Sequence, residues 1–587
     1  MAGAVAKWSI VCKTGRGRDA GGVHSGAVEG PGSGAGTGGG APARRGSITS
    51  RRAVLRAGAL GLLGAAAAAC GVDRGSGRRH GPSTTTSGLP GTPPSTGRPA
   101  ATTTTTTTAT TVGGGPPTGA DWQVLRGALG GRLSLPGDPS YPLDRELYDP
   151  RWDSGRPAGI AYCASGDDVA RAVGFARDHS LAVAARSGGH SYAGYSTTSG
   201  LIVDVSLMSS VSVTGATANI GAGAQLVDIY SGVAASGLGV PAGSCPTVGI
   251  AGLALGGGMG VMDRLHGLTC DVVTSLQLVT ADGRVVQADE STNPDLFWAC
   301  RGGGGGNFGI ATAFELATFP APDLVLFGAA WPWAAASQLL PAWLEWCQDA
   351  PDELWSNCIL STGGGKAMTA SVGGAWAGSE AGARSLLNKL SLAAGLPTGQ
   401  VVGSSPFEQA MYTEAGCRGL SRAACHLRGR QAGGTLGRSV SVAKSDLLTG
   451  PLGESGTRAV LAGLEERLSQ GAPGTVAYDS LGGAVNRVPP GATAFVHRDA
   501  VASVQYSVTW PALPGPGELA SAQVWLDRWY ASLRPYVSGQ AYQNYIDPHL
   551  AGWQQAYYGA NLPRLQRVKA RWDPDDFFRF AQSIPLP

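Results

Sequence analysis

Three glycine-rich loops constrain the fold of this chain more than any other feature of its sequence. They span residues 186–192, 243–249 and 301–309 and lie next to segments with the apolar pattern of strands. Glycines at strand ends let backbone N–H groups approach a diphosphate closely. The whole chain has 92 Gly and 37 Pro in 587 residues, an excess that excludes a mostly helical bundle.

Strand and helix patterns alternate around these loops. After Asp167, which could cap a helix, Val169, Ala172, Val173 and Ala176 recur at helical spacing. A second helix is expected over 225–236, and strands are expected over 159–163, 181–185, 201–205 and 272–280, the last followed by a tight turn at Asp282-Gly283. Strands joined by short helices predict an α/β or α+β layer fold.

The charge distribution argues against a nucleic-acid partner. Residues 1–120 carry 13 Lys and Arg against 3 Asp and Glu, which leaves 31 against 38 for residues 121–587. The larger part of the chain therefore lacks the basic patch that nucleic acid or an anionic membrane surface requires. Apolar residues make up 43% of the chain, enough for one large domain or two to three ordinary ones, so complete disorder is excluded.

The ten cysteines do not predict a metal site. They contain no CxxC pair, so we expect no structural zinc and no other metal centre. Cys347 with Cys358, and Cys417 with Cys425, could form disulfides outside the cell, and their spacing decides neither pair.

An export signal is expected before the folded part. Residues 1–49 have no apolar periodicity and are typical of disorder or of sequence upstream of the true start. Arg51-Arg52 precedes an uncharged run over 57–69, whose 13 residues are too few to cross a bilayer, which takes about 20. The pattern is typical of a twin-arginine signal peptide, which favours export of a folded protein carrying a cofactor. The alternative is a chance basic pair before a buried helix.

A tether is expected next. Residues 71–120 are rich in Thr, Pro and Gly and predict a flexible linker. Cys70 follows three Ala and resembles the acceptor of a lipoprotein, so a lipid could hold the protein at a membrane. The alternative is cleavage and release. The export machinery is the other expected partner.

A dinucleotide fingerprint in the third loop is rejected. Gly304, Gly306 and Gly309 match GxGxxG, but the residues that follow, 310–314, have the pattern of a strand. A Rossmann site requires a helix there to hold the phosphates.

Taken together and in order, the motifs resemble the berberine bridge enzyme-like FAD-linked oxidases. Besides the loops, the resemblance rests on the glycine run over 256–260, Phe297-Trp298, the motif over 542–545, and the C-terminal segments over 557–561 and 572–578. It covers roughly residues 121–587.

The resemblance implies an α+β fold with a two-part FAD-binding domain of the PCMH type. Residues 121–320 would form the FAD-binding domain and 321–535 an inserted substrate-binding domain, an antiparallel sheet covered by helices. Residues 536–587 would return to complete the FAD domain. A disordered N-terminus with its signal (1–70) and the linker (71–120) would precede them.

The resemblance also implies that FAD is joined covalently at two points, the 8α methyl to His190 and C6 to Cys245. A neutral imidazole and a thiolate are nucleophiles that an electron-poor ring system captures. The other implied cofactor-binding residues lie in or near the glycine loops and the C-terminal motif: Arg186, Ser187, Gly188, Gly189, Ser191, Val248, Gly249, Gly252, Gly256, Gly257, Gly258, Gly306, Asn307, Gly309, Ile310 and Asn544.

Three residues are implied on the substrate side. Tyr542 matches the family tyrosine that acts as general base, and Tyr192 matches a tyrosine over the flavin. An ordinary tyrosine, with a pKa of about 10, is a poor base at neutral pH, so Tyr542 needs a lowered pKa or concerted loss of its proton. Gln505 is expected on a strand facing the substrate. Leu253 departs from relatives that have a polar His there, and Val248 stands at the position associated with oxygen access.

The expected function is therefore that of an exported oxidase. A hydride from an alcohol, an oligosaccharide hemiacetal or a secondary metabolite would pass to the flavin, and O₂ would become H₂O₂. Two alternatives remain open: a dehydrogenase with another electron acceptor, and a tethered carbohydrate-binding lipoprotein without catalysis.

Overall fold

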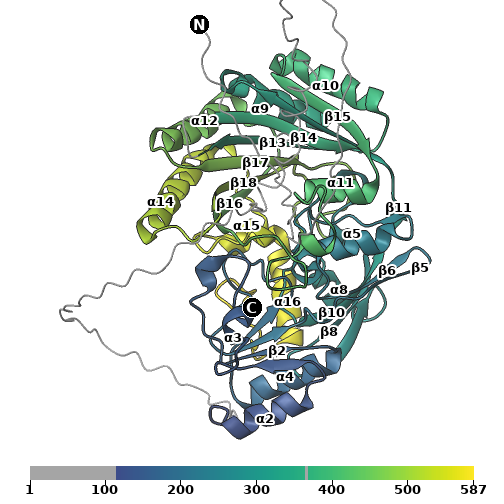
Figure 1. The fold of residues 1–587 in the computed structure, drawn as a ribbon, viewed down its shortest axis with the longest axis vertical. Coiled ribbons are helices and arrows are strands. Elements are labelled where there is room, and N and C mark those ends of the chain that lie inside the picture. The colour runs from purple at the N-terminus through teal and green to yellow at the C-terminus, as the bar shows by residue number, and fades with distance from the viewer. Residues whose placement is uncertain (1–113, 364–367) are drawn as a thin grey trace, which may run out of the picture. The chain divides into compact units, whose positions relative to one another are not determined.

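The computed structural model describes residues 114–363 and 368–587. The expected disordered N-terminus, signal peptide, Cys70 and most of the linker lie outside the described residues. The described part contains three larger β-sheets and a two-stranded one, each associated with helices (Figure 1). The expected α+β class is confirmed.

The first sheet has the strand order β1-β2-β4-β3 and contains β1 (Arg132–Ser134), β2 (Gly159–Tyr162), β3 (Val183–Arg186) and β4 (Leu201–Asp204). Strands β2, β4 and β3 are parallel, and β1 is antiparallel to β2. Helix α4 (Gly166–Asp178) connects β2 to β3 and buries the four apolar residues that the helical spacing predicted. Its N-cap is Ser165, whose hydroxyl accepts a hydrogen bond from the Asp168 N–H, so the cap predicted at Asp167 was wrong: Asp167 lies in the first turn.

The second sheet is antiparallel, in the order β5-β6-β10-β8-β9. It contains β5 (Val211–Thr214), β6 (Thr217–Gly221), β8 (Val273–Val279), β9 (Val285–Asp289) and β10 (Ile310–Ala317), with helices α5 (Leu226–Ala234), α6 (Ile250–Leu255), α7 (Asp263–His266) and α8 (Pro294–Ala299) between strands. Gly283, at φ +83°, makes the turn from β8 to β9 that the sequence predicted. One apolar core joins these two sheets.

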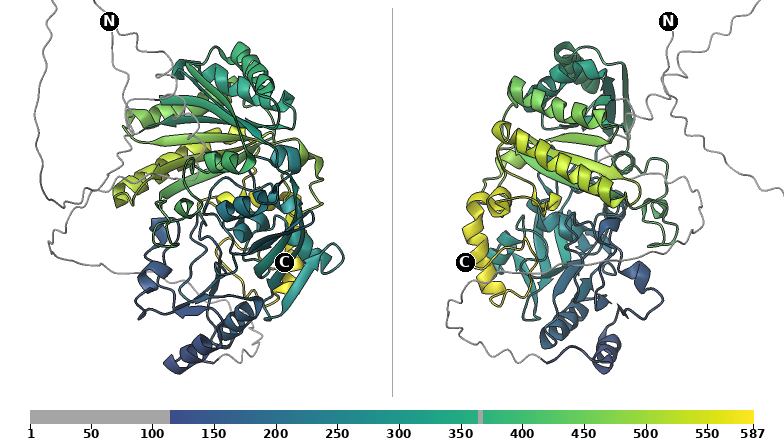
Figure 2. Two further views of the ribbon diagram at one scale, coloured as in Figure 1. Left: turned by 45° about the vertical axis from the view of Figure 1, so that its right-hand side comes forward. Right: turned by 90° about the vertical axis from the view of Figure 1, so that its left-hand side faces the viewer.

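The third sheet has seven antiparallel strands in the order β15-β12-β14-β13-β17-β18-β16. They are β12 (Leu324–Trp331), β13 (Leu354–Thr362), β14 (Met368–Trp376), β15 (Gly399–Ser405), β16 (Val440–Leu448), β17 (Gly474–Ser480) and β18 (Ala502–Trp510). Helices α9 (Ala336–Asp349), α10 (Glu380–Ala394), α12 (Gly453–Ser469) and α14 (Pro516–Leu533) cover one face (Figure 2).

The other face of the third sheet is largely polar, because successive residues of a strand point to opposite sides. On β17, Val476 and Tyr478 pack into the core under the helices, and Ala477 and Asp479 face away from it. The same alternation on β18 buries Val504 in that core. The side turned from the helices carries mostly polar residues: Asn357 on β13, Asp479 on β17, Ser503, Gln505 and Ser507 on β18, and Ser441 and Ser445 on β16.

The C-terminal segment returns to the first two sheets. Its helices α15 (Trp553–Tyr558) and α16 (Leu562–Trp572) contribute Tyr557, Leu565 and Trp572 to their core. Lys569 is fully buried, and its Nζ donates to Asp573 Oδ2 (2.6 Å) and to the Asn307 carbonyl (3.0 Å). The segment is therefore anchored directly to the third glycine loop.

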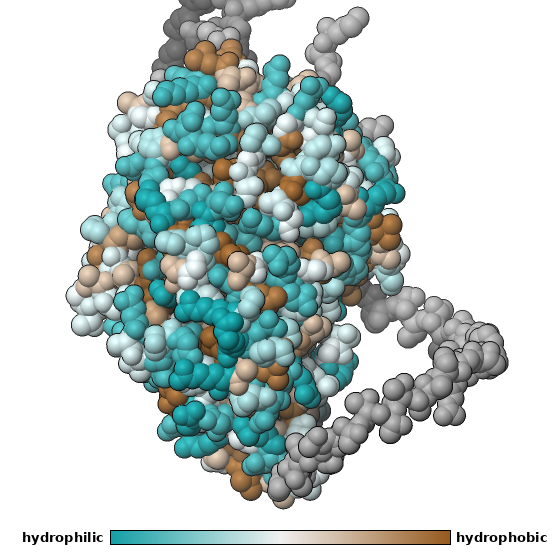
Figure 3. Space-filling view, turned by 180° about the vertical axis from the view of Figure 1, so that it is seen from behind, coloured by the Kyte–Doolittle hydropathy of each residue, from teal (hydrophilic) through white to brown (hydrophobic). Residues whose placement is uncertain are grey.

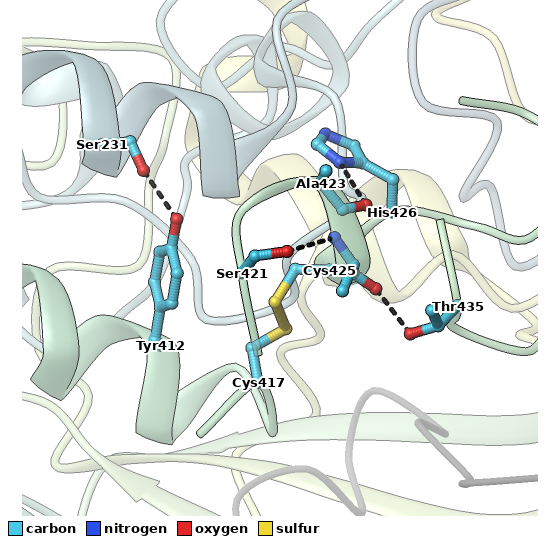
Figure 4. Close-up of a disulfide and its surroundings, with 9 residues drawn as sticks. Ser231, Tyr412, Cys417, Ser421, Ala423, Cys425, His426 and Thr435 are labelled. Atoms are coloured by element: carbon cyan, nitrogen blue, oxygen red, sulfur yellow. Dashed lines mark hydrogen bonds between the residues drawn. A yellow bond between two sulfur atoms is a disulfide. The ribbon is translucent and has the colours of Figure 1, made fainter. Parts of the chain in front are cut away.

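One of the two cysteine pairs left open by the sequence is a disulfide. Cys417 and Cys425 are bonded in a segment that follows α11 (Phe407–Glu414) (Figure 4). Cys347 and Cys358 are buried free thiols. Next to the disulfide, His426 Nε2 lies 2.9 Å from Asp228 Oδ2 on α5, so the bonded segment is held against the second sheet's helix.

On the face seen in Figure 3, apolar side chains are scattered among polar ones. Leu392 and Leu396 are the most exposed large apolar residues of the described part, at 88% and 84%. No helix among the described residues has the length and apolarity that a bilayer crossing requires.

Candidate flavin-binding site

A cavity of about 510 Å³ lies where the three sheets meet. All three glycine loops line it, together with residues of the C-terminal motif and of the polar face of the third sheet. One cavity thus brings together the sequence motifs that suggested a cofactor and a face that could receive a substrate.

The first two glycine loops touch through their backbones. A Cβ added to Gly188 would lie 2.4 Å from the Gly249 nitrogen, and one added to Gly249 would lie 2.0 Å from Ser187 Oγ. Any side chain at these two positions would push the loops apart. Both positions therefore require glycine, because the loops are too close together to leave room for a Cβ.

His190 and Cys245, the expected attachment residues, lie on these two touching loops and both line the cavity. His190 Nε2 is 2.9 Å from Thr247 Oγ1, and the imidazole stacks on Tyr148 with ring centroids 4.0 Å apart. Burial lowers the pKa of His190 to about 3. The ring is therefore neutral at physiological pH, and Nδ1 has no hydrogen-bond partner among the described residues.

Arg186 begins the first loop and is almost completely buried. Its Nε pairs with Asp204 at the end of the neighbouring strand, and Nη2 donates to Tyr162 Oη at 3.2 Å. Nη1 is buried without a partner among the described residues. Because Arg186 lines the cavity, this guanidinium can donate one further hydrogen bond to an acceptor of a ligand.

The third glycine loop leads into a strand, as the sequence predicted, because residue 310 begins β10. The rejection of a Rossmann fingerprint is confirmed. Gly304 and Gly306 have φ values of +95° and +74°, which favour glycine. Asn307 Nδ2 donates to the Gly303 carbonyl at 3.1 Å, which fixes the loop internally.

Tyr542 reaches the cavity from the C-terminal motif and is 2% exposed. Its Oη accepts hydrogen bonds from the Gly258 N–H and from Asn544 Nδ2, both at 2.8 Å. Burial raises the pKa of Tyr542 above its usual value, whereas the two donors oppose that rise because they stabilise the phenolate. Burial prevails, so Tyr542 is a neutral phenol here, and the lowered pKa that a resting base requires is not provided by its protein neighbours.

Tyr192 and Gln505 form a second polar contact at the cavity. Gln505 Nε2 donates to Tyr192 Oη at 2.8 Å. Burial raises the pKa of Tyr192 to about 12, so it is neutral as well. Tyr192 lines the cavity, whereas Gln505 lies behind it and is 3% exposed. The structure therefore places Gln505 as a support for Tyr192.

Most of the other expected residues line the cavity: Ser187, Gly188, Gly189, Ser191, Val248, Gly249, Gly252, Gly306, Asn307, Gly309, Ile310 and Asn544. The run Gly256, Gly257 and Gly258 is not among the lining residues. It packs behind the tyrosine: a Cβ on Gly256 would lie 2.0 Å from Asn544 Oδ1, and one on Gly257 would lie 3.2 Å from the Tyr542 ring. This run shapes the site by positioning Tyr542.

Several lining residues were missed from the sequence. Tyr148 supports His190, and Asp263, Asp479 and Tyr545 surround the end of the cavity next to the third sheet. Tyr545 had a signal, since it belongs to the recognised C-terminal motif. The other three lie outside all the motifs and come together only through tertiary structure.

The residues present fit FAD. The glycine loops that line the cavity can bring backbone N–H groups close to a diphosphate, the buried Arg186 guanidinium has an unpartnered Nη1 to donate, and the neutral imidazole of His190 lies in the same cavity. This fold and site define an FAD-dependent oxidoreductase of the PCMH type.

Comparison with known proteins supports this class of protein. Residues 157–289 match the family model described as FAD binding domain, and residues 541–585 match the one described as berberine and berberine like. The uncharacterized FAD-linked oxidoreductase YgaK of Bacillus subtilis is 33% identical over 464 residues, with 78% of this chain and 97% of that protein covered. Reticuline oxidase of Eschscholzia californica is 30% identical over 462 residues, with 73% and 83% covered. The chain belongs to the berberine bridge enzyme-like family of FAD-linked oxidoreductases.

Solved structures give the same result. The BBE-like 1 protein of Physcomitrella patens superposes with a TM-score of 0.72 at 30% identity, covering 80% of this chain and 99% of that one. A chitooligosaccharide oxidase superposes with a TM-score of 0.70 at 27% identity, covering 80% and 100%.

The contact between the first two loops predicts a selective effect on cofactor retention. Gly249→Ala should lower the flavin content of the purified protein at least about tenfold, because its Cβ would collide with Ser187 and separate the loops. Flavin absorbance per protein measures the effect. Gly174→Ala, in α4 where the added Cβ meets nothing within 4 Å, is the matched control and should keep its flavin without lowering its thermal midpoint. Equal flavin content in both variants would contradict this account of the loops.

Proposed function

We propose that this protein is an exported oxidase with FAD attached through both His190 and Cys245, and that it oxidises an alcohol, a hemiacetal or a related group of a sugar or secondary metabolite. The observation that carries the proposal is the single cavity shared by the two attachment residues and Tyr542. Bound FAD supplies an acceptor for a hydride and a donor that reduces O₂ to H₂O₂.

The state of His190 supports attachment. An imidazole can act as a nucleophile only when one of its nitrogens is unprotonated, and burial lowers the pKa of His190 to about 3. The contact of Nε2 with Thr247 Oγ1 orients the ring and leaves Nδ1 for bonding. Cys245 is two residues before Thr247, so the same contact ties its loop to the histidine loop.

Tyr542 is suited to exchanging a proton with a substrate. Two N–H groups already donate to its oxygen, so its own O–H is left to meet a substrate hydroxyl in the cavity. The same donors stabilise the phenolate that forms when the proton leaves. Tyr192, held by Gln505, offers a second phenol in the cavity lining and can orient the substrate.

The relatives support the substrate classes. Reticuline oxidase and chitooligosaccharide oxidase are named for a secondary metabolite and a sugar oligomer. The polar face of the third sheet, with Asn357 and Ser441 lining the cavity, offers hydrogen bonds to either.

The proposal extends to location. The paired arginines at 51–52 and the linker over 71–120 support export by the twin-arginine route, followed either by lipid anchoring at Cys70 or by cleavage and release. These residues lie outside the described part, except for the end of the linker. A doubly attached cofactor would suit an exported enzyme, since lost FAD could not be replaced outside the cell.

Attachment is tested by mass. After acid precipitation, the wild-type polypeptide should remain yellow and be heavier by one FAD. His190→Ala and Cys245→Ala should each keep FAD through the remaining bond, and the double variant should release it. Intact-mass spectrometry of the pellets measures this. Cys347→Ala, which removes a buried free thiol, is the control and should keep both flavin bonds. A colourless, unmodified wild-type pellet would overturn covalent attachment and favour the alternative of a carbohydrate-binding protein.

The role of Tyr542 predicts a pH dependence. Deprotonation is favoured as pH rises toward its raised pKa, so kcat/KM should increase with pH across the alkaline range. Tyr542→Phe should lower kcat/KM by about 10²–10⁴-fold and flatten that profile without changing flavin content. The partly exposed Tyr536→Phe is the control. An unchanged profile in Tyr542→Phe would assign the base to another group.

Reoxidation separates the oxidase from the alternative dehydrogenase. One glycine-to-alanine variant of berberine bridge enzyme is named a reticuline dehydrogenase, so the choice between oxidase and dehydrogenase needs a direct test here. Here Val248, a partly buried residue lining the cavity, should leave oxygen access open. We expect reduced enzyme mixed with air-saturated buffer in a stopped-flow instrument to reoxidise within seconds and produce H₂O₂. Reoxidation over minutes would support the dehydrogenase.

A further inference from the structure

The end of the cavity next to the third sheet carries two carboxyl groups without a cation. Asp479 lies on β17, beside Asn357 of β13 on one side and Ser503 of β18 on the other. Asp263 begins α7 and faces the same cavity. Among the described residues, no Lys, Arg or His forms an ion pair with either carboxyl group.

Asp263 shows that this end of the site is incomplete. Its side chain is 1% exposed, its Oδ1 has no hydrogen-bond partner among the described residues, and its Oδ2 accepts a long bond of 3.3 Å from the Gly260 N–H. The charge of the adjacent Arg264 lowers the pKa of Asp263 in part, but its guanidinium forms no ion pair with that carboxyl group, because Nη1 and Nη2 donate to the carbonyls of Leu481 and Ala350. A carboxylate buried in this way is costly unless a ligand supplies the missing partner.

Aromatic rings line the cavity together with the two carboxyl groups, and Tyr545 is close enough to interact electrostatically with both. Tyr545 stacks on Tyr192 with centroids 5.5 Å apart and meets the Tyr542 ring edge-on at 5.0 Å. Trp355 of β13 lines the same cavity. Rings beside unpaired carboxylates attract ammonium groups, which are drawn both to the negative charge and to the electron-rich ring faces.

We propose that the substrate of this cavity carries an ammonium group, and that Asp479 and Asp263 bind it against the ring of Tyr545. The inference rests on the proposed function, because it takes this cavity as the substrate site. A neutral polyol would satisfy the sheet's serine and asparagine groups but would leave both carboxylates without a counter-charge. A cation satisfies both at once.

The charge of the site is coupled to pH. Burial raises the pKa of Asp479 to about 7, and burial together with the Asp479 charge raises that of Asp263 to about 8. Glu414 of α11 is also close, and burial raises its pKa to about 8. The other ionisable neighbours are Tyr192 and Tyr545, which burial keeps neutral, and Arg264. The site therefore gains negative charge as pH rises through about 7 to 8, and a fixed cation should bind more tightly as it does.

The test uses two benzyl alcohols of nearly the same shape. One carries a 4-trimethylammonio group, whose charge does not depend on pH, and the other a neutral 4-tert-butyl group. Isothermal titration calorimetry of the flavin-loaded protein should give a dissociation constant at least about tenfold lower for the cation at about pH 9. That advantage should shrink toward about pH 6, while binding of the neutral alcohol stays unchanged.

Asp479→Asn should remove most of the cation's advantage while leaving the binding of the neutral alcohol unchanged. Asp575→Asn, which removes a surface carboxylate that is 76% exposed, is the matched control and should keep the full advantage. Equal binding of the two alcohols by the wild-type protein, or no binding of either, would overturn the inference. So would a pH-independent preference for the cation. Binding needs neither turnover nor oxygen, so this test can fail while the oxidase proposal stands, and the reverse also holds.

Discussion

The backbone contact between the first two glycine loops is the constraint on which the rest of the site depends. The Gly188 and Gly249 positions are so close that neither can carry a Cβ. The loops arise from different elements: one follows β3 of the first sheet and the other leads into α6, which lies between β6 and β8 of the second sheet. Their contact therefore fixes the two sheets relative to each other at the cavity. The same contact positions His190 and Cys245, which lie on the two loops. The side chains of His190 and Thr247 lie at hydrogen-bond distance and connect the two loops a second time.

The third sheet lines the cavity and also holds two tyrosines of the site in position. Its apolar face is packed under four helices, which makes its opposite face a rigid polar surface. From that surface Gln505 holds the phenol of Tyr192, and Ser445 Oγ accepts a hydrogen bond from the Tyr542 N–H at 3.1 Å. Two tyrosines, one from the first glycine loop and one from the C-terminal motif, are thus held by the third sheet. A shift of this sheet would move both phenols together, so their proposed roles toward a substrate cannot vary independently.

The sequence predicted those parts of the site that depend on local backbone chemistry. Glycine loops, the strand after Gly309 and the C-terminal tyrosine motif are each encoded in a few consecutive residues. The end of the cavity at Asp263 and Asp479 was missed, because these residues are more than 200 positions apart and neither belongs to a motif. The sequence predicted the correct face of the strand for Gln505 but also predicted contact with the substrate. Alternation along a strand shows to which face a side chain points, but not how far that side chain lies from the cavity. The cap at Asp167 failed for a similar reason: Ser165 competes for the same N–H groups, and only the backbone path decides between them.

Burial has opposite consequences at the two ends of the cavity. Desolvation disfavours charge everywhere, so it keeps His190 unprotonated and also favours protonated Asp263 and Asp479. For the histidine the neutral form is the nucleophilic one, which the proposed attachment requires. For the two acids the neutral form cannot pair with a cation, and either a rise in pH through about 7 to 8 or a ligand that brings positive charge into the cavity restores their carboxylates. Burial therefore limits the negative charge of Asp263 and Asp479 at neutral pH, and any further charge at the sheet end depends on pH and on what binds there. The proposed attachment of a cofactor at one end of the cavity and the proposed selection of a cation at the other would both follow from the same exclusion of water.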